Sequence, residues 1–536
     1  MAAMPIVATA ARPDTTEPAG GGGGELVDLG TFALDAPEHL DPALNSTLDA
    51  YQVINALYDG LTDIDFTDPA NPEVKPHLAE SFEANEDATV WTFQIREGMA
   101  FSDGEAILPS TFQRSWERAT SPDILANSSY AYLYSFIEGG QAKIDGEAET
   151  ISGVVADDEA MTLTVTLSAP YGNFAAVAGF QTFFPVPTAA DEASVDFENT
   201  LMVGNGPYAM ESARTDEEIA LVRNDAWTGD VNGETWPNRP ERLVFRVSAD
   251  ADTSYNSLEA GEGDTARIPS GRTAEAQENW GTTTEVPILG VYYYQFDQRD
   301  EIVGGPDNVL LRQAISQAID REAINDAIFD GARVPATGIT PEGIPGFMPD
   351  ICDYCTYDPD AAQAAFDEWT DAGNTLSGPI PIQYGAGGVH GDIVQLVIDN
   401  LSEIGIEAVP EELDTETYFT QMRDGGCVMC RTGWIADYPT YDNFMFDLFH
   451  SPFGGNNYGY ESEAFDALVD EAKATVDPAA AAALYQQAEE MLLNTDVMAV
   501  PIVFYRGDYA FNAERLQGFT QTPGMLIPWE QVTIVE

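Results

Sequence analysis

The sequence predicts an α/β protein built from more than one domain. The chain has 536 residues, of which 44% are hydrophobic and 21% are charged. That composition is typical of a folded globular protein, and a packed domain takes about 100–200 residues. After residue 290 or so, strand-like segments alternate with segments of helical spacing. This alternation favours an α/β unit with a mixed sheet.

Short strand-like runs separated by turns dominate residues 25–290. Apolar and polar residues alternate along Val90–Arg96, and the turn residues Ser102–Gly104 follow. The segment Met161–Leu167 is rich in β-branched residues with a period of two. Both patterns predict strands with one buried face.

The second half of the chain predicts long helices between strands. Apolar residues at helical spacing predict one helix over Leu310–Phe329. A second helix begins with Asp358 as its N-cap and Pro359 in its first turn, and runs to Gly373. The other predicted elements are the strands Ile380–Tyr384, Ile406–Pro410 and Ala499–Tyr505 and the helices His390–Ile404 and Asp477–Leu493.

Acidic residues far outnumber basic ones. There are 90 Asp and Glu against 22 Lys and Arg, a formal net charge of −68, and the only lysines are Lys75, Lys143 and Lys473. This balance excludes unaided binding to nucleic-acid phosphates or anionic lipid, since both require positive charge on the protein. Such a surface repels itself unless salt screens it. We therefore expect a protein from a saline environment whose stability is not greatest in low salt.

Residues 1–25 are predicted to form a flexible tether. Residues 11–24 are rich in Thr, Pro and Glu and end in a run of glycines. No stretch of the sequence reaches the ~20 apolar residues of a membrane-spanning helix. The N-terminus also lacks the basic segment followed by an apolar segment that is typical of a signal peptide. An exported protein without its signal and lipid-anchoring cysteine would look like this, and so would an ordinary disordered tail.

The four cysteines form two CxxC pairs, Cys352 with Cys355 and Cys427 with Cys430. Two such pairs can supply four thiolates to zinc, whereas an exported chain favours disulfides. The segment Cys427–Ile435 resembles a strand, in which the second pair would lie roughly 10 Å apart, beyond disulfide reach. We therefore expect the second pair to bond to the first, with a zinc site and free thiols as the alternatives.

The sequence contains no recognisable catalytic motif. Its four histidines, His39, His77, His390 and His450, lie far apart and lack metal-binding spacing. It has neither the nucleophile elbow of hydrolases nor the glycine-rich loop that holds phosphates. Among 90 acids a pair of carboxylates can always be chosen, so such a pair is uninformative. We expect a protein that is not an enzyme and that uses no cofactor or metal.

A series of short motifs runs along the chain from about residue 30 to the C-terminus. The motifs are Leu40–Pro42, Leu57–Leu61, Leu78–Phe82, Trp91–Phe93, Phe101–Gly104, Gly204–Tyr208, Tyr292–Tyr294, Leu311–Ala314, Ala318–Glu322, Tyr357–Pro359 and Gly433–Tyr438. Each motif alone is weak, and the ordered series is specific. In order and spacing it resembles the dipeptide- and oligopeptide-binding family of ABC-transporter substrate-binding proteins, solute-binding protein family 5.

The resemblance implies a bilobal clamp of the periplasmic-binding-protein type (type II) with mixed sheets in each lobe. A discontinuous first lobe would combine residues 26–60, 187–288 and 498–536, and residues 61–186 would form a small inserted domain. Residues 289–497 would form the second lobe, with hinge segments near Leu289 and Met498. The solute would lie between the lobes, and closure would bury it.

The resemblance also assigns the groups that would hold the two ends of a peptide. In peptide-binding relatives an aspartate in a Trp-x-Ala-Asp-Tyr setting receives the ligand ammonium, and Asp437 matches it here. A buried ammonium needs such a partner, because an unpaired buried charge costs several kcal/mol. For the ligand carboxylate the matching residues are Arg431 and His390. Arg431 precedes Asp437 by about 20 Å of extended strand, close to the span of a short peptide.

Other positions of the cleft follow from the same resemblance. Gly433 and Ile435 flank the aromatic residue Trp434 in the acid's motif, and Tyr505 matches a second aromatic position. Three more residues are expected at the edges of the cleft. They are Tyr130 in the inserted domain, Leu48 in a segment whose backbone could pair with ligand, and Arg267.

One departure from the family concerns a disulfide. Some relatives join the first strand of the second lobe to the segment beside the acid, where this sequence has Gly290 and Ile435. The two CxxC pairs are therefore a different cross-link, which we expect to stabilise the sheet of the second lobe.

Together these features predict an extracytoplasmic solute receptor. We expect it to capture di- to oligopeptides as a monomer and deliver them to the permease of an ABC importer. A receptor of the same fold for an oligosaccharide or another small solute is the alternative within the binding class. A secreted hydrolase is the alternative from another class.

Overall fold

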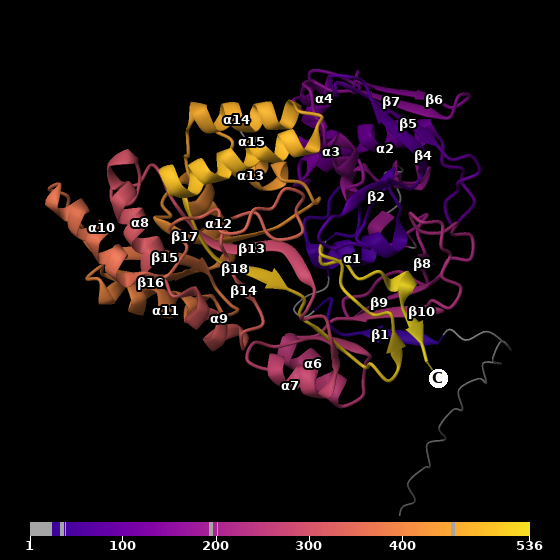
Figure 1. Cartoon of the computed structure of the whole chain (residues 1–536). Coiled ribbons are helices and arrows are strands. Elements are labelled where there is room, and N and C mark those ends of the chain that lie inside the picture. The colour runs from indigo at the N-terminus through magenta and orange to yellow at the C-terminus, as the bar shows by residue number, and fades with distance from the viewer. Residues whose placement is uncertain are drawn as a thin grey trace, which may run out of the picture.

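The computed structural model describes residues 24–32, 37, 39–191, 197–200, 202–451 and 456–535. Figure 1 shows two halves side by side, one built mainly from the first 290 residues and the other from the residues after them. Most of the predicted tether, residues 1–23, lies outside the described residues. Its last residue, Glu25, begins the first strand.

A seven-stranded mixed sheet forms the base of the first half. Its order is β12-β19-β11-β1-β10-β9-β8. Strand β1 is parallel to both neighbours, and the other pairs are antiparallel. The strands are β1 (Glu25–Asp28), β8 (Tyr208–Met210), β9 (Glu218–Arg223), β10 (Arg242–Arg246), β11 (Thr265–Arg267), β12 (Gly281–Thr282) and β19 (Tyr509–Phe511). The sheet thus joins the beginning, the middle and the end of the chain.

A four-stranded antiparallel sheet of order β4-β5-β7-β6 is the second large sheet of the first half. The predicted strands are confirmed as β5 (Val90–Ile95) and β7 (Thr162–Thr166), and every second side chain of each is buried. The other elements here are β2 (Thr62–Asp65), β3 (Glu73–Pro76), β4 (Ala79–Ala84), β6 (Val154–Asp157), α1 (Leu48–Leu57), α2 (Pro109–Ala119), α3 (Pro122–Leu125), η1 (Ala131–Phe136), α4 (Gly140–Ile144) and α5 (Phe174–Val177).

A six-stranded mixed sheet forms the second half, in the order β14-β18-β13-β17-β15-β16. Its central strand β13 is buried on both faces, since Leu289, Val291 and Tyr293 face one core and Tyr292, Tyr294 and Phe296 face another. The strands are β13 (Pro287–Phe296), β14 (Val334–Pro335), β15 (Ile380–Gly385), β16 (Ala408–Leu413), β17 (Met429–Ile435) and β18 (Ala499–Arg506). Mixed sheets in both halves confirm the α/β prediction.

The boundaries of the lobes remain a proposal. Strand β18 belongs to the six-stranded sheet, although residues 498–536 were expected in the first lobe. The chain passes to the seven-stranded sheet between β18 and β19, at Gly507 and Asp508.

One predicted helix of the second half is divided, and three helices, α12 to α14, were not predicted. The single helix expected over Leu310–Phe329 is two helices, α8 (Val309–Ala318) and α9 (Arg321–Phe329), because the Asp320 side chain accepts a hydrogen bond from the Ala323 N–H and starts a new helix. The others are α10 (Pro359–Asp371), α11 (His390–Glu403), α12 (Thr415–Asp424), α13 (Asp442–Phe449), α14 (Glu463–Ala474) and α15 (Pro478–Glu490), and the smaller helices of the first half are α6 (Ala251–Glu259) and α7 (Thr273–Asn279).

The prediction that one CxxC pair bonds to the other is wrong. Cys352 bonds to Cys355 and Cys427 to Cys430, with Cα atoms 5.4 and 5.7 Å apart. The cause lies in the start of β17 at Met429, which leaves Cys427 in the turn before the strand. The two pairs also belong to different buried clusters. The alternative of a four-thiolate zinc site is therefore wrong as well.

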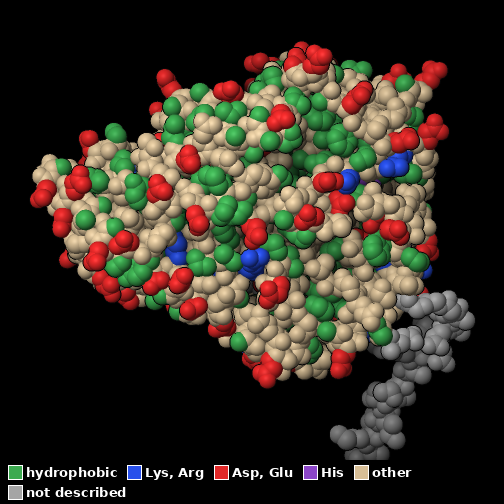
Figure 2. All heavy atoms as spheres, in the orientation of Figure 1, with side chains coloured by type: hydrophobic (Ala, Val, Ile, Leu, Met, Phe, Trp, Pro, Cys, Tyr) green, Lys and Arg blue, Asp and Glu red, His purple; other side chains and the backbone are tan. Residues whose placement is uncertain are grey.

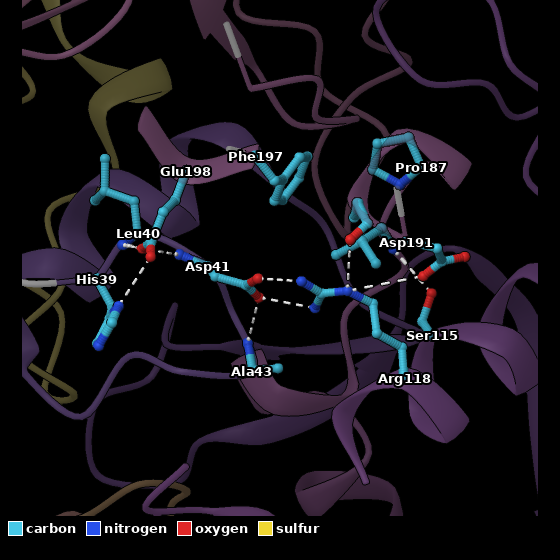
Figure 3. A network of polar contacts seen from close by, with 12 residues as sticks. His39, Leu40, Asp41, Ala43, Ser115, Arg118, Pro187, Asp191, Phe197 and Glu198 are labelled. Atoms are coloured by element: carbon cyan, nitrogen blue, oxygen red, sulfur yellow. Dashed lines mark hydrogen bonds and ion pairs between the residues drawn. The ribbon is translucent and has the colours of Figure 1, made fainter. Parts of the chain in front are cut away.

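A polar network fixes the N-terminal segment to α2 (Figure 3). The carboxylate of Asp41 is 2% exposed, accepts the N–H of Ala43 and binds the guanidinium of Arg118 through two hydrogen bonds. Glu198 accepts the N–H of Leu40 at 2.9 Å and lies 2.9 Å from Nδ1 of His39. Residues 39–43 are thus held on both sides by charge-assisted bonds.

The Asp41–Arg118 pair provides a test of this anchoring. Arg118→Met would leave a buried carboxylate without its counter-ion, which costs about 3–5 kcal/mol. We expect the free energy of unfolding, measured by urea denaturation at constant high salt, to fall by that amount. Lys75→Met removes a surface charge paired with Glu73 and should change little. A variant Arg118→Met as stable as the parent would contradict the role of the network.

Candidate functional site

A cavity of about 250 Å³ lies where the two halves meet. Figure 2 shows acidic side chains scattered over the whole visible face and apolar side chains gathered between the halves. The first half contributes the start of α1, strand β2 and the segment around α5, and the second half contributes the end of β17. The lining residues are Ser46, Thr47, Leu48, Tyr51, Asp63, Ile64, Phe66, Tyr130, Ala176, Gly179, Phe180, Gln181, Leu289, Trp434, Ile435, Ala436, Asp437, Tyr438, Pro439, Gly524 and Leu526.

The carboxylate of Asp437 lies in this cavity with one oxygen unsatisfied. Its Oδ1 accepts a long hydrogen bond of 3.4 Å from the hydroxyl of Tyr130, across the junction of the halves. Its Oδ2 is buried and has no hydrogen-bond partner among the described residues. Burial, reinforced by the negative charge of Asp447, raises the pKa of Asp437 to about 7. A buried acceptor without a donor is costly, so the cavity is prepared for a donor or a cation.

Asn443 holds the acid and its neighbour in place. Its Oδ1 accepts the backbone N–H of Asp437 at 3.0 Å and the indole N–H of Trp434 at 2.9 Å. Its amide donates to Oδ2 of Asp447 at 2.8 Å, and the Tyr438 hydroxyl donates to the same oxygen at 2.7 Å. This fully buried residue in the first turn of α13 fixes the geometry of the site.

Arg431 and His390 meet in a second cluster around Tyr292. The guanidinium of Arg431 lies 4.5 Å from the centre of the Tyr292 ring, and Nδ1 of His390 lies 3.4 Å from the Tyr292 hydroxyl. Burial and the charge of Arg431 lower the pKa of His390 to about 4. The histidine is therefore neutral at pH 7, and Arg431 supplies the positive charge of the cluster.

Tyr505 and Gly433 lie next to this second cluster. A Cβ on Gly433 would lie 2.7 Å from the Tyr505 hydroxyl and 3.4 Å from the Arg431 guanidinium. A larger residue at this position would therefore displace the Tyr505 hydroxyl. The Tyr505 ring also stacks under Arg333, whose guanidinium is 5.4 Å from its centre.

The structure brings together some predicted residues and separates others. Leu48, Tyr130, Trp434, Ile435 and Asp437 line the cavity, whereas the cluster of Arg431, His390, Tyr505 and Gly433 lies outside its lining. Arg267 is occupied elsewhere. Its guanidinium binds Asp49 at 3.1 Å, Asp508 at 3.0 Å and the carbonyl of Gly30 at 3.0 Å. These contacts give Arg267 a structural role, in which it connects segments of the first half.

Sequence reasoning missed several lining residues. Tyr51, Phe66 and Phe180 supply aromatic walls, and Asp63 and Gln181 supply polar groups. Of these residues, Tyr51 could have been predicted from the sequence, because it lies one helical turn from the predicted cleft residue Leu48. The others reach the cavity only through long-range packing.

Two further findings concern metal ions and membrane spans. No group of three or more His, Cys, Asp or Glu residues suited to a metal ion occurs in the part of the chain that the structure describes. Nor does any helix within the described ranges have the length and apolar character needed to cross a membrane.

The fold and the site define a two-part solute receptor, and comparison with known proteins places it in a family. Residues 73–456 match the middle region of the bacterial extracellular solute-binding proteins, family 5. The chain belongs to this family of substrate-binding proteins of ABC transporters, whose members are receptors that act outside the cytoplasm and not enzymes. The resemblance inferred from the motifs is therefore confirmed.

Individual relatives differ in the solutes that their names give. The oligopeptide-binding protein OppA of Bacillus subtilis is 26% identical over 500 residues, covering 90% of this chain and 88% of the relative. The probable deoxycholate-binding periplasmic protein YgiS of Escherichia coli is also 26% identical, over 477 residues, covering 87% and 86%. The structure of the Escherichia coli murein tripeptide binding protein MppA superposes with a TM-score of 0.77 at 24% identity, covering 96% and 98%. This likeness confirms the fold.

Proposed function

We propose that this receptor binds peptides with a free amino terminus in the cavity between its halves. The observation that carries the proposal is the buried, unsatisfied Oδ2 of Asp437. A peptide ammonium would supply the missing donor and a compensating charge at once. A charge-assisted hydrogen bond of this kind contributes about 1.5–3 kcal/mol.

The other groups suit the rest of a peptide. Arg431, on the same strand as the site, has a buried Nε without a partner among the described side chains and would receive the ligand carboxylate. The aromatic residues Tyr51, Phe66, Phe180 and Trp434 give the cavity broad apolar walls that do not select one side chain. The names of several relatives, such as the dipeptide-binding protein DppE of Bacillus subtilis, support a peptide ligand.

The receptor alternatives are less well matched to the site. A neutral oligosaccharide would leave the charge of Asp437 without compensation, which is costly in a buried site. Deoxycholate is an anion and would meet a carboxylate of the same sign. Delivery to the permease of an ABC importer follows from the family, and the identity of the solute is the proposed part.

The role of Asp437 is tested by an isosteric change. Asp437→Asn keeps the shape but removes the charge, so the affinity for trialanine measured by calorimetry should fall about tenfold or more. Because burial opposes its ionisation, the variant without ligand should be at least as stable as the parent at pH 8. Asp68→Asn, which removes an acid in an exposed turn, is the matched control.

Acetylated trialanine separates the possible ligand classes in the same experiment. Loss of binding on acetylation supports an ammonium site. Equal binding of both peptides, or an Asp437→Asn variant with unchanged affinity, would contradict it.

The affinity should also depend on pH in a defined direction. The free carboxylic acid has a pKa of about 7, and an ammonium ligand binds its ionised form, so binding lowers this pKa. Affinity is therefore lost as the pH falls through 7, and the ligand amine, with a pKa of about 7.7–8.0, stays mostly charged up to pH 7.5. Trialanine should bind roughly tenfold more weakly at pH 5.5 than at pH 7.5. Asp437→Asn should flatten this dependence, and a parent protein with flat binding would refute the mechanism.

A further inference from the structure

Lys473 lies at a direct contact between the two halves of the protein. It belongs to the last turn of α14 in the second half, one of the helices at the top of that half in Figure 1. Its Nζ lies 3.8 Å from the ring centre of Phe136, 4.4 Å from that of Tyr171 and 3.4 Å from that of Phe446. Phe446 comes from α13 of the same half, whereas Phe136 and Tyr171 come from the first half. One ammonium thus occupies a cage of rings from both halves.

Hydrogen bonds surround this cage on both sides. The N–H of Gly172 donates to the carbonyl of Lys473 at 3.1 Å. Asp442 on α13 accepts hydrogen bonds from the hydroxyl of Tyr171 and from the amide of Asn173, the latter at 2.7 Å. The fit is tight, because a Cβ on Gly172 would lie 2.9 Å from the carbonyl oxygen of Thr475.

The cage is connected to the binding cavity through α13. Asp447 is 4% exposed, and the positive charge of Lys473 is the largest influence that favours its ionised form. Asp447 in turn accepts hydrogen bonds from Asn443 and Tyr438, and Asn443 holds the N–H of Asp437. The charge of Lys473 acts on Asp447, and hydrogen bonds then link Asp447 through Asn443 to the backbone of the acid in the cavity.

We propose that Lys473 is the latch that holds the two halves closed over the cavity and couples closure to the position of Asp437. When the halves separate, Lys473 keeps Phe446 and Asp447 in its own half and loses Phe136 and Tyr171. Asp442 loses its two donors from the first half at the same time. The closed state gains these contacts and the open state lacks them, so they set the closed fraction on which the affinity for any solute depends. The latch does not depend on which solute the cavity takes.

The scarcity of lysine makes the latch directly measurable. The chain has three lysines, and Lys75 and Lys143 serve as internal standards in one sample. Reductive methylation followed by mass spectrometry reports how often each amine is accessible. Burial lowers the pKa of Lys473 to about 8, and exposure removes this effect, so an accessible Lys473 should react like an ordinary lysine and a caged one should react slowest of the three. We expect Lys473 to react about tenfold or more slowly than Lys143 without ligand, since its reaction requires opening.

Variants separate a latch from a merely buried lysine. Gly172→Ala forces the halves apart at Thr475 and should raise the methylation rate of Lys473 severalfold, while the rates of Lys75 and Lys143 stay unchanged. Lys473→Met keeps the length of the side chain and removes its charge. It should increase the radius of gyration of the unliganded protein in X-ray scattering and weaken trialanine binding by roughly threefold to 30-fold. Lys143→Met makes the same charge change outside the contact and should do neither.

The outcomes keep this proposal distinct from the peptide proposal. A Lys473 that reacts as fast as Lys143, or a rate unchanged by Gly172→Ala, would overturn the latch. So would a Lys473→Met variant with the scattering curve of the parent. If trialanine fails to bind the parent protein, the peptide assignment fails, and the methylation and scattering results still decide on the latch.

Discussion

The site depends on one buried carboxylate that the protein itself leaves half satisfied. Oδ1 of Asp437 accepts a long hydrogen bond from Tyr130, and Oδ2 has no partner among the described residues. An uncompensated group of this kind destabilises the empty protein, so it persists only where the surrounding structure imposes it. Asn443 provides that constraint by fixing the backbone of Asp437 from α13. The empty cavity is thereby preorganised for a positive group, and the cost is recovered when that group binds.

Because acidic residues so far outnumber basic ones, the positions of the few buried cations show where positive charge is needed in the fold. Arg431 lies over Tyr292 near the site, Lys473 occupies an aromatic cage at the junction of the halves, and Arg118 binds Asp41 under the N-terminal segment. Each of these cations joins parts of the chain that are distant in sequence. In a protein with a net charge of −68, placing the few positive charges at such junctions offsets repulsion where the chain segments meet.

Local patterns predicted the elements well, and long-range packing decided the rest. The strand β5 and the cap of α10 by Asp358 were predictable because period and capping are local. The break between α8 and α9 was missed although Asp320 is itself a capping residue, since apolar spacing continues across it. The cysteine pairing failed because β17 begins two residues after Cys427. In the site, the motif around Asp437 was predictable, whereas Phe180 reaches the cavity only through tertiary packing.

A crystal structure of the complex with a short peptide that has free termini tests the central claim most directly. The account predicts the ligand ammonium nitrogen within about 3 Å of Oδ2 of Asp437, the distance of a charge-assisted hydrogen bond. A complex in which that oxygen faces only water, with the amino terminus of the peptide held elsewhere, would contradict it.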